Sequence, residues 1–357
     1  MKADSVKGLA IVKKGIEAIS ALEIKELIKK NSKIEGCLLT FSCSRKDLCK
    51  LCYEGRSFTK ILEFLGEFEF NGIEDIKNKI EKLKINFRAE SFAARCIKEK
   101  SDVQSMEVEK AVGDSFNVKV DLENPEKIII AFIHGNQCHL GVDYSGVELS
   151  KRDYRIFTHP ASLKANVAYA MVRIAGYNPK ETFLDPFCGA GTIPIEAALF
   201  AAGKSVHFYS KNKFAFLKFM KYDFKDSEKN SDTKIFACDL LQHHLKSAEK
   251  NAKIAGVNKK ISFSRTEVEW LDTKFNEKSI DKIVANPPQI TSLNSKQMEK
   301  IFADFFHNAV YILKPKGKIV LITNNPEFIA EKAKKEGLRL EKSLEIDNLR
   351  IIVFVPE

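Results

Sequence analysis

Phe183-Leu-Asp-Pro-Phe-Cys-Gly-Ala-Gly-Thr192 and Ile283-Val-Ala-Asn-Pro-Pro-Gln289 are the two stretches that decide the fold of this chain. The first predicts a buried strand over residues 182–185, which turns through two glycines into a helix over residues 193–202. The second predicts another buried strand, over residues 281–285, that ends in a polar amide and two prolines. Together they indicate a doubly wound sheet whose strand ends hold a nucleoside cofactor beside a flat, amine-bearing substrate.

Strands and helices alternate along the rest of the second half, as a parallel sheet requires. The further strands expected there cover residues 234–238, 261–264, 318–323, 338–346 and 350–355. The expected helices cover residues 161–175, 240–255, 295–313 and 327–336. The last two strands follow each other directly, so their hairpin should place an antiparallel strand at the edge of the sheet. The predicted fold class is therefore α/β, with a seven-stranded, Rossmann-like sheet.

The first half predicts a smaller α+β module. Apolar residues at helical spacing predict helices over residues 15–30, 46–65, 73–83 and 101–112. The expected strands cover residues 37–41, 86–98, 117–122, 127–134 and 137–145. Asn124-Pro125 and Gly135-Asn136 are the turn signals between the last three strands. A short charged connector, residues 150–155, separates this module from the alternating half.

The chain of 357 residues has a formal net charge of +10 and a pI near 9.0, which favours a polyanionic partner. Residues 1–160 have a net charge of +2, so most of the excess lies in the remainder, at +8. A lysine-rich surface suited to solubility or to heat would look the same, so charge alone does not establish nucleic-acid binding. No apolar run approaches the ~20 residues of a membrane span, and residues 1–8 lack the apolar core of a signal peptide. We therefore expect a cytoplasmic protein with no membrane partner.

Four of the eight cysteines are crowded together as Cys37, Cys43, Cys49 and Cys52. The spacing of Cys49 and Cys52 suits a pair of metal ligands. No second pair and no nearby histidine completes such a site, however, and apolar residues at helical spacing surround both thiols. We therefore expect these cysteines to pack in a core as small apolar groups, with neither a disulfide nor a bound metal.

The glycine turn after residues 182–185 predicts a cofactor site. Gly189 and Gly191 let the backbone approach a ligand without a Cβ collision, and the following helix N-terminus offers free N–H groups. Pro194 stands where a dinucleotide-binding turn needs a third glycine, so a pyrophosphate cofactor is disfavoured. Asp185, at the carboxyl end of the strand, would instead face an amine, such as that in the methionine part of S-adenosylmethionine (SAM).

Two more acidic side chains follow neighbouring strands. Asp239 ends the next strand, where a carboxylate accepts both hydroxyls of a ribose. It lies further from Gly191 than is usual because a lysine-rich insertion, residues 203–233, intervenes. Glu267 follows the third strand and is placed to accept a hydrogen bond from an adenine amino group. Each acid alone would suit a surface, but three polar groups at successive strand ends predict one nucleoside site.

Asn286-Pro287-Pro288 completes the predicted chemistry, which is methyl transfer from a sulfonium to an exocyclic amine. The lone pair of such an amine is delocalised into its ring, so the site has to orient the amine and stabilise the positive charge that develops. The amide oxygen of Asn286 and the carbonyl of Pro287 can accept both amine hydrogens, and the prolines fix the direction of that carbonyl. Standing alone, the same residues would suit a turn that merely ends a strand.

These motifs resemble those of the class I amino-methyltransferases. A wider set of segments is similar to the THUMP-containing RNA methyltransferases that make N2-methylguanosine in tRNA; these are residues 141–155, 153–163, 213–216 and 251–256. The resemblance implies four parts: an N-terminal ferredoxin-like domain (1–84), a THUMP RNA-binding domain (85–149), a linker (150–165) and a Rossmann-like methyltransferase domain (166–357). It also implies SAM as the cofactor, a monomer, and tRNA as the partner, gripped near its acceptor end.

The resemblance further implies the roles of individual residues. Cofactor contacts fall on Thr158, His159, Asp185, Phe187, Gly189, Gly191, Thr192, Asp239, Leu240, Glu267, Val268 and Asn286. The catalytic motif is Asn286-Pro287-Pro288-Gln289, in which Asn286 and Pro287 hold the guanine amine. Candidates for contacts with RNA phosphates are Arg88, Arg95, Lys98, Arg152 and Arg155, although ordinary solvated charges would explain about half of them.

Gln289 departs from the family pattern, in which this position is aromatic and stacks on the flipped base. Stacking is worth about 1–3 kcal/mol per base, so its loss weakens capture of the base unless another ring replaces it. Ile290 likewise replaces the usual glycine. Three alternatives to tRNA guanine-N2 methylation therefore stay open: methylation of ribosomal RNA, RNA binding without turnover, and DNA adenine methylation, which leaves residues 1–150 unexplained.

Overall fold

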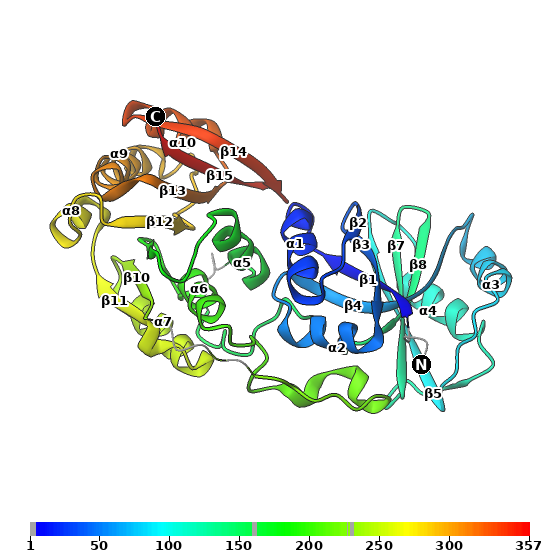
Figure 1. Cartoon of the computed structure of the whole chain (residues 1–357). Coiled ribbons are helices and arrows are strands. Elements are labelled where there is room, and N and C mark those ends of the chain that lie inside the picture. The colour runs from blue at the N-terminus through cyan, green and yellow to red at the C-terminus, as the bar shows by residue number, and fades with distance from the viewer. Residues whose placement is uncertain (1–4, 159–162, 227, 229–231) are drawn as a thin grey trace. The chain divides into compact units, whose positions relative to one another are not determined.

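The computed structural model describes residues 5–158, 163–226, 228 and 232–357 (Figure 1). These residues form two compact units. The first unit comprises residues 5–12, 20–149 and 209–225, and the second comprises the described residues of 13–19, 150–208 and 226–357. Within the described ranges, no helix combines the length and the apolar character needed to cross a bilayer.

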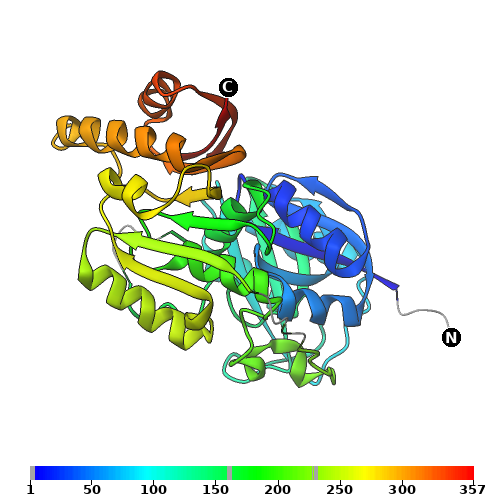
Figure 2. The ribbon, with the colours of Figure 1, turned by 60° about the vertical axis from the view of Figure 1, so that its left-hand side comes forward.

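The second unit is built on a seven-stranded sheet with the strand order β11-β10-β9-β12-β13-β15-β14 (Figure 2). Its strands are β9 (Thr182–Asp185), β10 (Lys234–Asp239), β11 (Ile261–Arg265), β12 (Ile280–Ala285), β13 (Leu313–Thr323), β14 (Leu338–Ile346) and β15 (Leu349–Pro356). Strands β9 to β13 run parallel, and β15 pairs antiparallel with both β13 and β14. The predicted α/β class, the seven strands and the closing hairpin are confirmed.

Helices cover both faces of this sheet. They are α5 (Ala165–Ile174), α6 (Thr192–Ala202), α7 (Gln242–Ala255), α8 (Leu271–Lys274), α9 (Ser295–Ile312) and α10 (Pro326–Lys335), with the 3-10 helices η3 (Asn258–Lys260) and η4 (Val268–Trp270). Val284 and Val320 join the core formed with α5, α6 and α7, whereas Ile283 and Leu321 join the core formed with α8, α9 and α10. Adjacent residues of one strand thus enter different cores, which explains the continuous apolar runs in the sequence.

The strand order reverses between β9 and β12. The chain passes outward from β9 to β10 and β11 and then returns to pair β12 with the other side of β9. At such a switch point the loops after neighbouring strands diverge and leave a crevice at the carboxyl ends. Asp185, Asp239 and Asn286 stand at or directly after the carboxyl ends of β9, β10 and β12.

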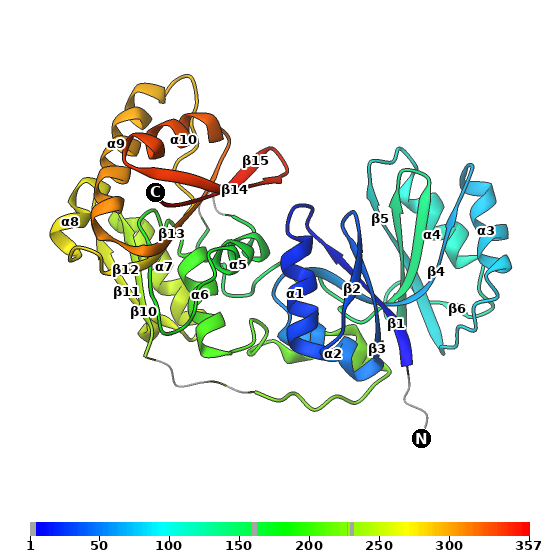
Figure 3. The same cartoon turned by 45° about the horizontal axis from the view of Figure 1, so that its top comes forward.

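The first unit contains an eight-stranded sheet with the order β2-β3-β1-β4-β8-β7-β5-β6 (Figure 3). Its strands are β1 (Ser5–Val12), β2 (Ser32–Glu35), β3 (Leu38–Ser44), β4 (Phe58–Glu69), β5 (Ser91–Glu99), β6 (Lys119–Val120), β7 (Lys127–His134) and β8 (Gln137–Asp143). Its helices are α1 (Glu17–Ile28), α2 (Arg45–Glu54), α3 (Ile73–Lys82) and α4 (Ser105–Gly113). Only residues 20–28 of α1 belong to this unit. β4 lies within residues 1–84 and pairs with β8, which lies within residues 85–149, so the two parts predicted for this half of the chain share one sheet.

Residues 209–225, from the predicted insertion, belong to the first unit and contain the 3-10 helices η1 (Lys211–Lys213) and η2 (Ala215–Lys218). Phe214 and Phe216 are buried in the core of this unit. The rings of Phe214 and Phe224 pack edge-on against the buried ring of Tyr53. The insertion therefore completes a core that residues 20–149 begin.

The helix predicted over residues 46–65 is wrong beyond the end of α2. Gly55 adopts an extended conformation (φ −69°, ψ 146°), and the chain then enters β4. The backbone N–H groups of Arg56 and Ser57 donate to the buried carboxylate of Glu23, at 3.0 and 2.9 Å. These bonds satisfy the backbone where the helical ladder stops, so the break is stabilised by a side chain from α1.

Further differences concern the strands and helices of the first unit. β5 begins at Ser91 rather than at residue 86, and α4 begins at Ser105 rather than at residue 101. The strand expected over residues 117–122 shrinks to the two residues of β6. Neither β1 nor β2 was predicted from the sequence. The residues of β2 are mostly exposed, and an exposed strand has little apolar periodicity to detect.

The cysteines predicted to pack in a core do so. Cys43, Cys49 and Cys52 are buried in the apolar core of the first unit. Burial raises the pKa of the Cys43 and Cys49 thiols to about 12, so both stay neutral at physiological pH. Among the side chains of the described ranges, no three potential ligands gather as a metal site.

Candidate functional site

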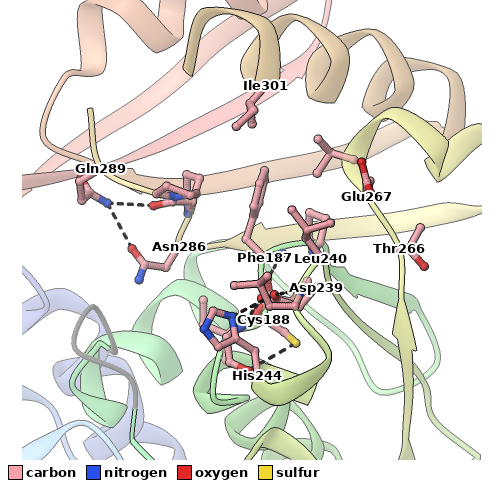
Figure 4. A pocket seen from close by; sticks show the side chains of 18 of the residues that line it. Phe187, Cys188, Asp239, Leu240, His244, Thr266, Glu267, Asn286, Gln289 and Ile301 are labelled. Carbon is pink, nitrogen blue, oxygen red and sulfur yellow. Dashed lines mark hydrogen bonds and ion pairs between the residues drawn. The ribbon is translucent and has the colours of Figure 1, made fainter. Parts of the chain in front are cut away.

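A cavity of about 880 Å³ opens at the carboxyl ends of β9, β10 and β12 (Figure 4). Its lining includes most of the residues predicted for cofactor and substrate: Asp185, Phe187, Gly189, Thr192, Asp239, Leu240, Glu267, Val268, Asn286, Pro287, Pro288 and Gln289. The volume lies in the range of small-molecule sites in proteins. Residues spread over a hundred positions of the sequence therefore meet in one place, as the strand-end argument predicted.

Asp185 is buried at the end of β9, with its two carboxylate oxygens in different situations. Oδ1 accepts a hydrogen bond from the backbone N–H of Phe187 at 3.1 Å. Oδ2 meets no hydrogen-bond donor among the residues that the structure describes. Burial, together with the nearby charge of Asp239, raises the pKa of Asp185 well above its ordinary value. A buried acceptor that lacks a donor fits a cationic ligand group such as the ammonium of SAM.

The two glycines of the turn have different tasks. Gly189 has a positive φ of 50° and lines the cavity, and a Cβ built on it would meet no protein atom within 4 Å. Gly191 has φ 83°, and a Cβ there would lie 2.8 Å from the Cβ of Ala248 on α7. Gly191 is not among the described residues that line the cavity, and it allows α6 to pack closely against α7. Its cofactor contact stays a prediction.

Asp239 ties three parts of the site together. Its Oδ2 accepts from the backbone N–H of Gly189 at 2.9 Å. Its Oδ1 accepts from the N–H of Leu241 at 2.9 Å and lies 3.0 Å from Nδ1 of His244 on α7. A carboxylate offers about four acceptor positions, so the predicted ribose hydroxyls can use the remaining position on Oδ2 and replace His244 at Oδ1.

Glu267 and Val268 follow β11 and line the cavity, as does Leu240. The N–H of Thr266 donates to the backbone carbonyl of Asp239 at 3.2 Å, which ties this loop to the end of β10. Leu240 and Val268 offer apolar surface, and Glu267 offers an acceptor in a largely exposed position. This mixture suits the apolar faces and polar edge of a nucleobase.

The side-chain amide of Gln289 lies among the acceptors of the catalytic motif (Figure 4). Its nitrogen, Nε2, lies 3.3 Å from Oδ1 of Asn286 and 3.1 Å from the carbonyl oxygen of Pro287. The same nitrogen lies 3.3 Å from the carbonyl oxygen of Ile322, and Oε1 accepts from the N–H of Asn324 at 2.8 Å. One amide group thus reaches both of the acceptors predicted for the substrate amine.

The two cofactor contacts predicted in the connector, Thr158 and His159, are not found in the cavity lining of the described residues. Thr158 is exposed and is absent from the cavity lining within the described part of the chain. His159 lies outside the described residues. The preceding residue, Phe157, is anchored through its backbone to the side chain of Asn251, which also donates to the carbonyl of Ala190 at 2.9 Å. The connector is therefore tied to the glycine turn one residue before Thr158.

Two further parts of the cavity lining were not predicted from the sequence. His244 of α7 lines the cavity, as do five residues of α9, namely Lys296, Gln297, Lys300, Ile301 and Asp304. The residues of α9 are three or four positions apart, so they share one face of the helix. That spacing is visible in the sequence, but only the packing of α9 shows that this face meets the cavity.

The candidate RNA contacts divide by exposure. Arg152 is corrected: its side chain is completely buried, and Nε donates to Glu196 on α6 at 2.9 Å. A guanidinium that neutralises a buried carboxylate cannot reach a phosphate on RNA. The remaining candidates are exposed or half-buried on the surface; these are Arg88, Arg95, Lys98 and Arg155.

Comparisons with known proteins agree with the fold. A putative methyltransferase solved with S-adenosylhomocysteine (SAH) matches with a TM-score of 0.82 and 20% identity, covering 100% of this chain and 99% of that chain. TrmN from Thermus thermophilus matches with a TM-score of 0.74 and 24% identity, covering 99% and 100%. The strand order and the strand-end cavity define the fold as that of the class I methyltransferases.

The family follows from the sequence models. Residues 152–347 match the RMKL-like methyltransferase domain, and residues 70–143 match the THUMP domain. The first match spans more than half of the chain, so this chain belongs to the RMKL-like methyltransferase family. The predicted resemblance is thereby confirmed.

Two curated relatives are similar over nearly the whole chain. The tRNA (guanine(6)-N2)-methyltransferase of Archaeoglobus fulgidus is 28% identical over 94% of this chain and 87% of its own length. The enzyme of the same name from Methanocaldococcus jannaschii is 29% identical over 93% and 94%. The ribosomal RNA large subunit methyltransferase K/L of Vibrio parahaemolyticus is 25% identical, and the match covers 43% of that protein.

Proposed function

We propose that this chain transfers a methyl group from SAM to the exocyclic N2 amine of a guanosine in tRNA. The observation that carries the proposal is that one nitrogen, Nε2 of Gln289, lies within 3.3 Å of both Asn286 Oδ1 and the Pro287 carbonyl. These two oxygens can therefore accept both hydrogens of a single planar NH2 group. The amine of guanine carries such a group.

The protein's contribution to the reaction is binding, orientation and charge stabilisation. SAM supplies an electrophilic methyl carbon, whose bond to sulfur breaks as its bond to the amine nitrogen forms, leaving SAH. Asn286 and Pro287 hold the amine so that its lone pair faces that carbon, and their oxygens stabilise the positive charge on the nitrogen. The methylated amine then loses its extra proton to water, which restores a neutral amine.

The residues of the cavity fit the cofactor along its length. Asp185 offers a buried acceptor to the ammonium group, Gly189 leaves open space, and Asp239 offers oxygens for the ribose. Glu267 stands beside apolar side chains where the adenine would lie. Each part of the family's cofactor is thereby assigned to a residue of this chain.

tRNA is favoured over ribosomal RNA by the length of the matches. The two relatives named as tRNA enzymes match over 87% and 94% of their lengths, whereas the relative named as a ribosomal RNA enzyme matches over 43%. The name of the first two points to guanosine 6, which lies in the acceptor stem of tRNA. We infer that the first unit, with its THUMP match, binds that part of the molecule, in the cytoplasm and as a monomer.

The test is mass spectrometry of tRNA from a strain that lacks this chain. One N2-methylguanosine should disappear and should return when the purified protein and SAM are added to that tRNA. Asn286→Ala should restore at most about a hundredth of the activity, because a positioned acceptor of this kind contributes about 2.7–4 kcal/mol to the transition state. An unchanged tRNA profile in the deletion strain would contradict the proposal.

A second candidate is an RNA-binding protein without turnover. It is favoured by the bonds from Gln289 to the two acceptors, which occupy the place of the substrate amine. A single-turnover assay with SAM and tRNA separates the two candidates. Any methyl transfer that Asn286→Ala abolishes rules out the second.

A further inference from the structure

The side-chain amide of Gln289 carries an NH2 group like that of the substrate amine, and it faces the same acceptors of the catalytic motif. A carboxamide NH2 and the N2 amine of guanine are both planar groups with two N–H donors, and both have a delocalised nitrogen lone pair. Nε2 of Gln289 stands 3.3 Å from Asn286 Oδ1 and 3.1 Å from the Pro287 oxygen. Two nitrogens cannot occupy one position, so Gln289 and the substrate amine compete for these oxygens.

The backbone around Gln289 is held independently of its side chain. Asn324 donates through Nδ2 to the carbonyl of Ile290 at 2.8 Å and accepts through Oδ1 from the N–H of Ile290 at 3.2 Å. Nδ2 of Asn294 donates to the backbone carbonyl of Gln289 at 3.0 Å. The loop can therefore keep its path while the Gln289 side chain rotates away from the motif.

The side chain is also weakly fixed at its nitrogen end. The three contacts of Nε2 range from 3.1 to 3.3 Å, longer than a usual N–H to oxygen bond. Only the bond from the N–H of Asn324 to Oε1, at 2.8 Å, is short. Because Gln289 is half-buried and lines the cavity, a substrate amine that enters the cavity can replace the Gln289 amide at these oxygens.

We propose that Gln289 is a specificity-determining latch, which occupies the amine site of the free protein and yields only to a substrate group that supplies two N–H donors. The proposal rests on the proposed function, because it assigns Asn286 and Pro287 to the amine. A latch of this kind reduces the apparent affinity for substrate by the fraction of molecules in which it is closed.

The variant that tests the latch is Gln289→Met, which keeps the length of the side chain and removes its donors and acceptor. With tRNA from the deletion strain as substrate, KM should fall about tenfold, as expected when a few ordinary hydrogen bonds no longer compete. The value of kcat should change much less. If Gln289 instead positioned Asn286 for catalysis, kcat would fall and KM would hold, which would overturn the latch.

Asn324→Ala is the matched control. It removes the side-chain bonds to Ile290 but keeps the backbone N–H that donates to Gln289 Oε1. It should therefore loosen the loop and leave KM for tRNA at or above the value of the unaltered protein. A fall in KM equal to that of Gln289→Met would show that loop mobility, and not the latch, limits binding, and would overturn the inference.

A second measurement is independent of turnover. In the free protein, the side-chain NH2 of Gln289 should give an NMR signal with slow hydrogen exchange, identified by its loss in Gln289→Met. Addition of tRNA should make its exchange fast, whereas a signal that exchanges fast without tRNA would overturn the inference. Methylation by the unaltered protein with an unchanged KM in Gln289→Met overturns the latch alone, and no methylation by either protein overturns the proposed function.

Discussion

At the scale of one residue, Asp185 has a buried carboxylate oxygen that is available to a ligand. Its Oδ2 is buried without a donor among the described residues, and burial raises the pKa of the carboxyl well above its ordinary value. In the free protein, burial therefore favours the protonated form of this carboxyl, whereas an ammonium ligand would favour its ionised form. Cofactor binding should release a proton wherever the two forms coexist.

Asp185→Asn should weaken SAM binding about tenfold to a hundredfold, the range expected for a hydrogen bond to a charged group. Because burial raises the pKa of Asp185, the affinity of the unaltered protein for SAM should rise as pH rises through that pKa. The variant should lack that dependence. Isothermal titration calorimetry at a series of pH values measures both, and a parallel pH dependence in the two proteins would contradict the role of Asp185.

The same substitution should stabilise the protein in the absence of SAM. A carboxyl whose pKa is raised by folding stabilises the folded state below its unfolded pKa, and this contribution is lost as pH rises through the folded value. Asp185→Asn has no such loss, so its advantage in Tm should grow from acid to neutral pH. Thermal unfolding without ligand checks this sign.

Single residues at strand ends were predictable, and their partners were not. Asp185, Asp239 and Asn286 follow apolar strands directly, so a parallel sheet had to bring them to one edge. Arg152 resembled a surface charge because Glu196, its partner in the core, lies 44 positions away. The latch position of Gln289 depends on a side-chain rotamer, which no spacing in the sequence encodes.

At the scale of elements, β4 shows why an apolar pattern can mislead. Ile61 and Leu62 are adjacent and both fully buried, because they enter cores on opposite faces of the sheet. A strand with two buried faces loses its alternation, and its apolar residues then also fit helical spacing. The break after α2 depends instead on Glu23, a contact that is distant in the sequence.

Glu23→Ala should lower the stability of the first unit by about 2–4 kcal/mol, because it leaves the buried N–H groups of Arg56 and Ser57 without an acceptor. Glu23→Gln is the control, since it keeps one side-chain oxygen and should lose less. Burial raises the pKa of Glu23, so the unaltered protein should lose stability as pH rises, and Glu23→Gln should not. Denaturant unfolding at acid and neutral pH measures the differences, and equal losses in both variants would contradict this role.

At the scale of the whole molecule, the net charge of +10 predicts RNA binding that weakens with salt. Arg88 and Lys98 are exposed on the first unit. Replacing both with alanine should reduce the slope of log affinity against log salt by about 1.4–1.8, or roughly 0.7–0.9 per lost phosphate contact. Fluorescence anisotropy with labelled tRNA and the full chain measures this slope.

Arg339→Ala with Lys342→Ala is the control for this experiment. It removes the same charge from exposed positions on β14, the edge strand of the second unit. Its slope should stay close to that of the unaltered protein. Equal changes in the two double variants would mean that overall charge, and not contacts of the first unit, sets the affinity.

The division of the chain into units was the least predictable feature at this scale. Local patterns place strands and helices, but they do not report which unit a distant segment joins. The aromatic residues of 209–225 carry no periodicity that points to Tyr53, so only their packing assigns them to the first unit. The boundaries proposed at residues 84, 149 and 165 remain predictions.

Ribosomes deliver residues 209–225 well after residue 149, so a nascent chain cannot complete its first unit until that stretch emerges. At roughly 5–20 residues per second, several seconds pass before Phe214 and Phe216 reach their places beside Tyr53. Until then the ring of Tyr53 and its apolar neighbours stay open to chaperones or to aggregation. Expression of a fragment that stops near residue 149 should give an insoluble product, and co-expression of a peptide covering residues 209–225 should rescue it.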